Sequence, residues 1–299
     1  MMQNYFYSLF LIFSMLVTKA SGEREKFNPE KLKQTCLRAG APEQLAEKVV
    51  VEVEKKIFEG ISTKQILKIA LGILDREMPH VAAKYDLKGA IMRLGPAGFE
   101  FENLIGELLR EYGYQTSVHN ILKGYCVGHE VDVIAEKMVD GKKETGMIEC
   151  KYHNASGIFS GVKDVLYTYA RFEDLQRGAK FSGIKFTRCW LASNTKFSSD
   201  VIKYANCMKI TLIGWKYPEK IDERDKNAVP SLKRMLDEKR LYPITALRTI
   251  DRDSQEKLAA AGLMFCKDLV RNKMKELERT GISRRKLKEM IAEAETVCG

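Results

Sequence analysis

Two short apolar segments of this chain each contain a carboxylate, and these acids constrain the fold more than any other feature. Residues 131–134 read Val-Asp-Val-Ile, and residues 147–151 read Met-Ile-Glu-Cys-Lys. In a β-strand, residues i and i+2 point to the same face, so Glu149 and Lys151 share a face and Cys150 points away. A buried charge is costly unless it is paired or holds a metal. Taken alone, these residues are also compatible with a solvated ion pair on an edge strand, which contributes almost nothing to stability.

The residues between the two acids predict a hairpin. Residues 140–143 read Asp-Gly-Lys-Lys, which favours a turn, so Asp132 and Glu149 are expected to lie side by side. Two interior acids repel and raise each other's pKa unless a cation lies between them. Mg²⁺ takes carboxylate oxygens, waters and phosphate, so we expect Asp132 and Glu149 to hold Mg²⁺. Lys151 would activate water or stabilise charge on phosphorus, and Glu102 would hold a metal-bound water. This set predicts hydrolysis of a phosphodiester.

The elements around these acids form an ordered pattern that resembles a known family. Apolar residues at 101, 104, 105, 108 and 109 predict an amphipathic helix that includes Glu102. That helix, FENLIGELLREYGY, precedes GHEVDVIA and MIECKYH, and then a helix, a strand, a helix and a strand. The pattern resembles the PD-(D/E)-x-K nuclease superfamily and, within it, the Mrr-like restriction endonucleases. Over residues 96–218 it implies an α/β core, a restriction-endonuclease-like mixed sheet flanked by helices. Gly128-His129-Glu130 departs from the Gly-x-Gly that many relatives have before the Asp.

Residues 15–95 predict a separate, mainly α domain. The pattern LVTK-x-x-G-x-x-E-x-F-N-x-x-K-L, followed by IST before a helix and then AAKYDLKGAI, resembles the ATP-cone, a regulatory nucleotide-binding module of ribonucleotide reductases. The resemblance implies that ATP or dATP contacts Val17, Lys19, Glu25, Asn28, Lys31 and Thr63. Lysines can meet phosphates, and a Thr at a helix start offers its hydroxyl and backbone N–H. Ala20 stands where many ATP-cones have a second basic residue. The chain has no G-x-x-x-x-G-K-[ST] motif, so ATP is expected to regulate and not to drive work. The alternative is a helical module whose role is purely structural.

Residues 1–14 are interpreted as a start-site extension or a hydrophobic leader. The apolar run from Tyr5 to Val17 is short for a bilayer span, and no Lys or Arg precedes it as a signal peptide requires. Cleavage after it would remove the first strand of the ATP-cone pattern, so we expect no stable membrane association. The seven scattered cysteines form no C-x-x-C pair, which favours reduced thiols and a cytoplasmic location. A secreted or membrane-tethered nuclease is the alternative.

Residues 219–299 predict a charged linker followed by a basic helical segment. Its residues 241–270 resemble a helix-hairpin-helix, whose turn presents backbone N–H groups to DNA phosphates. A solvated helical bundle remains an equal alternative. The net charge of the whole chain is +10, which makes a polyanionic partner such as DNA plausible.

Together these features predict a Mg²⁺-dependent DNA endonuclease of the restriction type that is regulated by ATP or dATP. Cleavage of both DNA strands would favour a homo-oligomer. The alternative is a nucleotide-sensing DNA-binding regulator whose nuclease fold does not cut.

Overall fold

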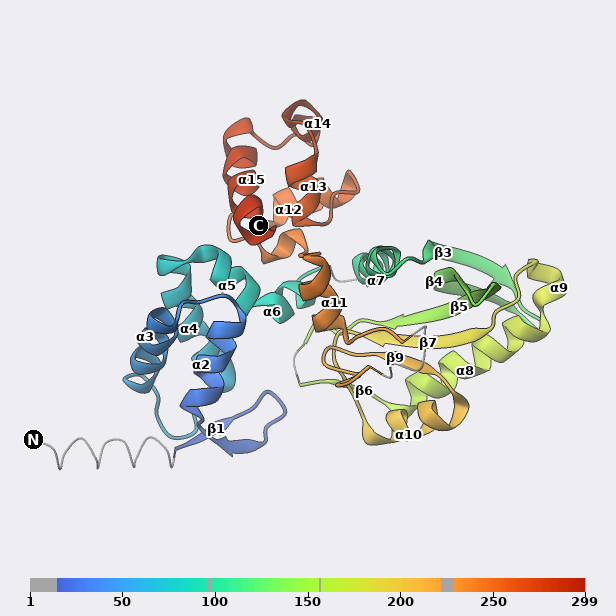
Figure 1. Cartoon of the computed structure of the whole chain (residues 1–299), viewed down its shortest axis with the longest axis horizontal. Coiled ribbons are helices and arrows are strands. Elements are labelled where there is room, and N and C mark those ends of the chain that lie inside the picture. The colour runs from blue at the N-terminus through green and yellow to red at the C-terminus, as the bar shows by residue number, and fades with distance from the viewer. Residues whose placement is uncertain (1–14, 96–97, 156, 222–227, 299) are drawn as a thin grey trace, which may run out of the picture. The chain divides into compact units, whose positions relative to one another are not determined.

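The computed structural model describes residues 15–95, 98–155, 157–221 and 228–298, and its contacts divide the chain into two compact units. One unit contains the chain up to Ala90 together with the part from Tyr242 onward, and the other runs from Ile91 to Leu241 (Figure 1). The extension or leader expected over residues 1–14 lies outside the described residues. No helix in the described part of the chain is both long enough and apolar enough to span a bilayer.

The N-terminal part of the first unit is a two-stranded sheet followed by helices. These elements are β1 (Leu16–Thr18), β2 (Arg24–Lys26), α2 (Pro29–Arg38), α3 (Glu43–Glu54), α4 (Thr63–Glu77) and α5 (Pro79–Tyr85). The Asn28 side chain caps α2 by accepting a hydrogen bond from the Lys31 N–H at 2.9 Å. Ser62 and Gln65 form a capping box at the start of α4. Thr18 of β1 bridges Ser62, so the small sheet is held against the N-terminus of α4.

The C-terminal part of the first unit is helical. Its elements are the 3₁₀ turn η1 (Ile244–Ala246), α12 (Arg252–Ala260), α13 (Cys266–Arg271), α14 (Met274–Glu278) and α15 (Arg284–Cys298). The last helix buries Leu287, Met290, Ala294 and Val297, which lie at helical spacing on one face. It packs against α13 and against α5, which explains why this segment belongs to the same unit as the N-terminal helices.

The second unit contains a five-stranded mixed sheet with the order β3-β4-β5-β7-β9. Its strands are β3 (Gln115–Lys123), β4 (Gly128–Val139), β5 (Lys142–Lys151), β7 (Arg188–Ser193) and β9 (Thr211–Ile213). β3, β4 and β5 run antiparallel, whereas β7 is parallel to both β5 and β9. Two short strands, β6 (Phe159–Ser160) and β8 (Lys196–Phe197), pair separately.

Helices cover both faces of this sheet. They are α7 (Phe99–Glu111), α8 (Val162–Arg177), α9 (Ala179–Ser182), α10 (Ser199–Met208) and α11 (Leu232–Lys239), while α6 (Leu87–Met92) spans the boundary between the units in the sequence. Figure 1 shows α7 over one face and α8 with α10 over the other. The predicted fold class, a mixed sheet flanked by helices with a mainly α N-terminal domain and a helical C-terminal segment, is confirmed.

The sequence periodicities explain the two elements that position the site. Helix α7 buries the apolar stripe that was expected from its spacing: Phe101, Leu104, Ile105, Leu108 and Leu109. The β4–β5 hairpin turns at Asp140 and Gly141, both of which have positive φ, 49° and 75°. That conformation matches the right-handed twist of paired strands, and Asp-Gly is a favoured sequence for it.

Candidate active site and nucleotide pocket

The β4–β5 hairpin brings Asp132 and Glu149 together. The antiparallel register pairs Val133 with Ile148. Asp132 comes directly before Val133, and Glu149 comes directly after Ile148, so the two acids occupy the next position along the hairpin. The carboxylate of Asp132 accepts a hydrogen bond from the backbone N–H of Cys150, with 2.7 Å between Oδ2 and N. The acids therefore lie side by side, as the hairpin predicts, and Asp132 is fixed by the backbone of the neighbouring strand.

Glu149 is almost fully buried and both of its oxygens face a cation. Only 5% of the residue is exposed. Its Oε1 lies 3.3 Å from Nζ of Lys151, which shares its face as expected, and its Oε2 contacts Nη1 of Arg171 on α8. Sequence reasoning missed Arg171. Its signal was its place in the buried stripe of α8, between Thr168 and Phe172, where an unpaired charge is costly.

Glu102 lies on the first turn of α7 and pairs with a histidine that was also missed. The Glu102 Oε2 and the His119 Nδ1 are 2.8 Å apart. The ring of His119 stacks on Phe99 with 4.0 Å between centroids and 8° between planes. His119 lies inside β3 and has a φ of 55°. The residue pairs between β3 and β4 include neither His119 nor Asp132. A non-glycine residue in the left-handed region persists only where its surroundings hold it there.

The site has an excess of buried negative charge. Burial and the nearby Glu149 carboxylate raise the pKa of Asp132 to about 6, although Arg171 and Lys151 oppose the rise. Burial, followed by the charges of Asp132, Glu130 and Glu149, raises the pKa of Glu102 to about 7. A cation added to the site would therefore favour the ionised form of both carboxylates.

The two central carboxylates fit a magnesium ion. Among the described residues, no group of three or more His, Cys, Asp or Glu side chains is arranged to hold a metal. Mg²⁺ does not require such a group, because it usually binds through one or two carboxylates, several waters and a substrate phosphate. The hard oxygens of Asp132 and Glu149 suit that mode of binding. Burial and the Glu149 charge raise the pKa of Asp132, so an added cation would favour its ionised form.

A buried polar network continues beyond Lys151 at the ends of β5 and β7. The backbone of His153 exchanges two hydrogen bonds with the Asn194 side chain, at 2.9 Å and 2.7 Å. The His153 Nε2 lies 3.2 Å from the Ser160 hydroxyl, which in turn donates to Ser193. Burial lowers the pKa of His153, with the charge of Lys151 acting in the same direction. The network fixes the chain where it leaves the active-site strand.

The first unit contains a cavity of about 290 Å³ that includes five of the six residues expected to contact nucleotide. These residues are Val17, Glu25, Asn28, Lys31 and Thr63. The sixth, Lys19, lies next to the cavity, because its Nζ is 2.9 Å from Oε2 of Glu25. The other oxygen of Glu25 lies 3.3 Å from Nζ of Lys31. The cavity thus places two lysines around one acid, although the side chain of Asn28 is already used to cap α2.

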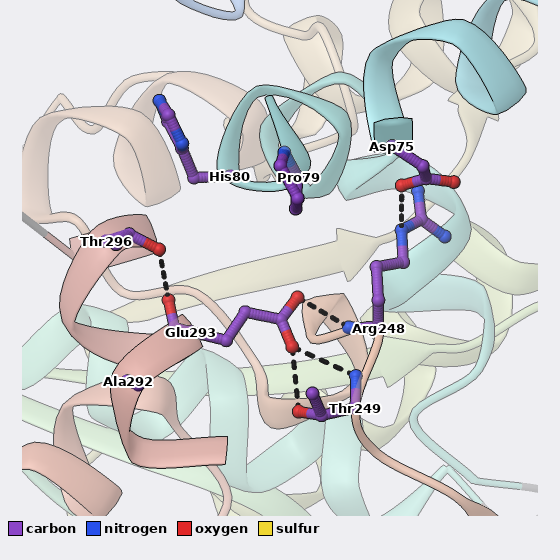
Figure 2. A pocket seen from close by; sticks show the side chains of 8 residues that line it. All are labelled: Asp75, Pro79, His80, Arg248, Thr249, Ala292, Glu293 and Thr296. Carbon is purple, nitrogen blue, oxygen red and sulfur yellow. Dashed lines mark hydrogen bonds and ion pairs between the residues drawn. The ribbon is translucent and has the colours of Figure 1, made fainter. Parts of the chain in front are cut away.

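A second cavity of the first unit, about 600 Å³, lies between the N-terminal helices and the C-terminal segment (Figure 2). The Glu293 carboxylate of α15 accepts hydrogen bonds from the backbone N–H groups of Arg248 and Thr249, at 2.7 Å and 2.9 Å. The Arg248 guanidinium reaches the other side, where its Nε lies 2.9 Å from Oδ1 of Asp75 and its Nη2 donates to the Ala82 carbonyl at 3.3 Å. Arg248 therefore joins the C-terminal segment to both α4 and α5.

Family models match three consecutive parts of the chain. A model described as an ATP cone domain matches residues 15–87, one described as a restriction endonuclease, of the Mrr type, matches residues 97–216, and one described as AF1548-like, C-terminal, matches residues 242–298. The predicted fusion of an ATP-cone to an Mrr-like restriction endonuclease domain is thereby confirmed.

Comparisons with individual proteins show the family. An uncharacterized protein of Archaeoglobus fulgidus is 42% identical over 195 residues, which is 65% of this chain and 100% of the relative. The crystal structure of AF1548, a protein of unknown function, is 41% identical, covers 67% of this chain and 98% of that chain, and gives a TM-score of 0.56. The crystal structure of VC1899 from Vibrio cholerae is 18% identical, covers 63% of this chain and 54% of that chain, and gives a TM-score of 0.29, which is too low to support an argument. The chain belongs to the family of AF1548-like proteins, and it combines an ATP-cone domain with a restriction endonuclease domain of the Mrr type.

Proposed function

We propose that this protein is a Mg²⁺-dependent DNA endonuclease whose activity responds to ATP or dATP. The observation that supports it most is the position of Asp132 and Glu149 side by side on the hairpin of a restriction endonuclease domain, with Lys151 on the same face. A metal ion at the two carboxylates would lower the pKa of a bound water and stabilise charge on the phosphate.

The residues of the site would divide the work as follows. Asp132 and Glu149 hold the ion, and the Cys150 N–H keeps Asp132 in place. Lys151 orients the attacking water and stabilises the negative charge that develops on phosphorus. Glu102, at the edge of the site, would accept a hydrogen bond from a water near the ion, and the charge of the ion would favour its ionised form.

The nucleotide would bind in the cavity of the first unit. Lys19 and Lys31 would exchange the Glu25 carboxylate for phosphate oxygens, while the hydroxyl and N–H of Thr63 lie at the N-terminus of α4, which favours an anion. ATP would thus act as an effector. DNA cleavage on both strands would require two copies of the chain.

The alternative is a nucleotide-sensing regulator that binds DNA without cutting it. The contact of Arg171 with Glu149 favours this alternative, because an arginine at the carboxylate competes with a metal ion. The complete set Asp132, Glu149 and Lys151 favours the nuclease.

Cleavage of plasmid and methylated phage DNA separates the two functions. The wild-type chain is assayed with Mg²⁺ or EDTA, with and without ATP, beside Asp132→Ala and Lys151→Ala. Lys143→Ala is the matched control, because Lys143 lies on the same strand as Lys151 but pairs with Glu136 outside the site. The nuclease requires Mg²⁺-dependent nicking that both site variants lose and the control keeps. Intact DNA binding without nicking under every condition would establish the regulator.

A further inference from the structure

Arg171 is an arginine in an apolar position. The inner face of α8 buries Val165, Thr168, Phe172 and Leu175 at helical spacing, and Arg171 lies among them with 8% of its surface exposed. Its Nε is buried and has no hydrogen-bond partner in the part of the chain that the structure describes. Burial of a guanidinium costs several kcal/mol unless a counter-charge offsets it, so the Glu149 carboxylate is what holds Arg171 in this position.

In the free protein, a metal ion would have to compete with two protein cations for the Glu149 carboxylate. Arg171 occupies one carboxylate oxygen and Lys151 faces the other. When all are ionised, Asp132, Glu149, Lys151 and Arg171 sum to zero formal charge, and Glu102 beside them adds one negative charge. A divalent ion added to this set would leave one uncompensated positive charge in a mostly buried place, which is unfavourable. Phosphate groups of a bound nucleic acid would supply the missing negative charge.

Tyr167 lies one turn earlier on α8, and its ring contacts Arg171 in the same conformation in which Arg171 contacts Glu149. The Arg171 Cζ lies 5.2 Å from the centroid of the Tyr167 ring, and the Lys151 Nζ lies 5.6 Å from it. The ring is 55% exposed, so it connects the buried guanidinium to the surface of the site. A guanidinium stacks well on an aromatic face and binds phosphate through paired N–H groups. Released from Glu149, Arg171 can remain on Tyr167 and contact a phosphate.

We propose that Arg171 exchanges partners during loading of the site: it neutralises Glu149 in the free protein, and it moves to a substrate phosphate when a divalent cation takes its place at the carboxylate. This proposal rests on the proposed function, because it requires a metal ion at Asp132 and Glu149. It predicts weak metal binding by the free chain and joint binding of metal and DNA. It also predicts that removal of Arg171 strengthens metal binding and weakens cleavage, two effects of opposite sign that a purely structural arginine would not produce.

Metal affinity is measured on the full chain with Mn²⁺, whose free ion gives an electron paramagnetic resonance signal. The variants are Arg171→Gln and, as the matched control, Arg177→Gln. Arg177 lies in the last turn of the same helix and stacks on Tyr125 at 4.6 Å, so the control removes the same charge from outside the site. We expect Arg171→Gln to bind Mn²⁺ about tenfold or more tightly than wild type, the size of effect that neighbours of metal ligands commonly have. Arg177→Gln should change the affinity less than about twofold.

Equal or weaker Mn²⁺ binding by Arg171→Gln than by Arg177→Gln would overturn the proposal. Addition of Asp132→Asn should abolish the Mn²⁺ site in every background. If Mn²⁺ binding never depends on Asp132, then the proposed metal site is wrong, which is a different failure from a wrong role for Arg171. In the cleavage assay, Arg171→Gln should lose activity despite its tighter metal binding, and full activity would overturn the exchange to phosphate.

A measurement on the wild-type chain keeps the proposal testable if Arg171→Gln does not fold. Fluorescence anisotropy gives the affinity for a short DNA duplex in Ca²⁺, a hard ion that takes carboxylate oxygens, and in EDTA. Because coupling between two ligands is reciprocal, joint loading requires Ca²⁺ to strengthen DNA binding by about tenfold or more. The same DNA affinity in Ca²⁺ and in EDTA would contradict the partner exchange.

Discussion

Glu102→Gln should stabilise the metal-free protein above neutral pH while it impairs the proposed activity. Glu102 lies where burial and four neighbouring carboxylates make a negative charge unfavourable. A glutamine has the same shape without the charge, and its carbonyl can accept the hydrogen bond from Nδ1 of His119 that the Glu102 carboxylate now accepts. The substitution therefore removes the electrostatic cost and keeps the local contact.

The size of the effect follows from the pKa. In the folded protein the pKa of Glu102 is about 7, compared with an ordinary value of 4.5. One pKa unit corresponds to about 1.4 kcal/mol, so ionised Glu102 lowers the free energy of unfolding by about 3 kcal/mol at high pH. Because the folded pKa is raised, this loss is absent below pH 4.5, grows between pH 4.5 and 7, and is complete above about pH 7. Glu102→Gln should be about 2–3 kcal/mol more stable than wild type at alkaline pH, and nearly equal to it in acid.

Urea unfolding in EDTA, monitored by tryptophan fluorescence, measures this difference in stability for the unit that contains Glu102. The chain has two tryptophans, and both, Trp190 and Trp215, lie in the unit that contains Glu102. Glu107→Gln on the same helix is the control, because Glu107 forms a surface pair with Arg110 at 2.7 Å. It should change stability by at most about 0.5 kcal/mol. A Glu102→Gln variant that is no more stable than wild type at alkaline pH, or whose gain is the same in acid, would refute the electrostatic argument.

Three further predictions test the fold of the two units. Phe101→Ala empties a fully buried position in α7 and should lower the stability of the nuclease unit by about 3–5 kcal/mol in urea, and a loss below about 1 kcal/mol would contradict its place in the core. Arg248→Ala removes the ion pair with Asp75 and should lower local stability by about 1–3 kcal/mol, seen as faster hydrogen exchange in α15; unchanged exchange would contradict it. Hydrogen bonds from His129 and from the loop backbone, working against burial, hold the pKa of Asp174 at about 2. The stability that Asp174 adds should be complete above pH 4 and lost as the pH falls through 2, so Asp174→Ala should unfold at a higher pH than wild type in an acid titration and should not show the same midpoint.

The sequence predicted the nuclease fold because its signals are local. The stripe that begins at Phe101 defines α7, and Asp140-Gly141 defines the hairpin turn. The period of two in the strands then places Glu149 and Lys151 on one face. The sequence does not show where α5 ends and α6 begins: the two helices break at Asp86, whose carboxylate is buried and faces Arg248 at 3.8 Å. Asp also competes with the helix for backbone hydrogen bonds, which favours a break.

The partners of the active-site acids were beyond sequence reasoning because they come from other elements. His119 lies in a strand whose alternation gives no sign of its left-handed conformation. The same limit applies in the other unit, where Arg248 is separated from Asp75 by most of the chain and nothing in either segment indicates the other. Arg171 gave a signal, a charge in an apolar stripe, but the stripe alone does not say which acid it faces. Such contacts depend on how helices and strands pack against one another, whereas sequence periodicity gives information only about each single helix or strand.

Each acid of the site has a different element to hold it. The Cys150 backbone of β5 fixes Asp132, Arg171 of α8 fixes Glu149, and His119 of β3 fixes Glu102. The site therefore forms only when the sheet and the helices on both of its faces are in place. Buried carboxylates repel, so they destabilise any partial assembly that lacks one of these partners. The apolar contacts of α7 and α8 must supply the free energy that keeps the acids together, which is why the interior of the domain, and not the acids, determines its stability.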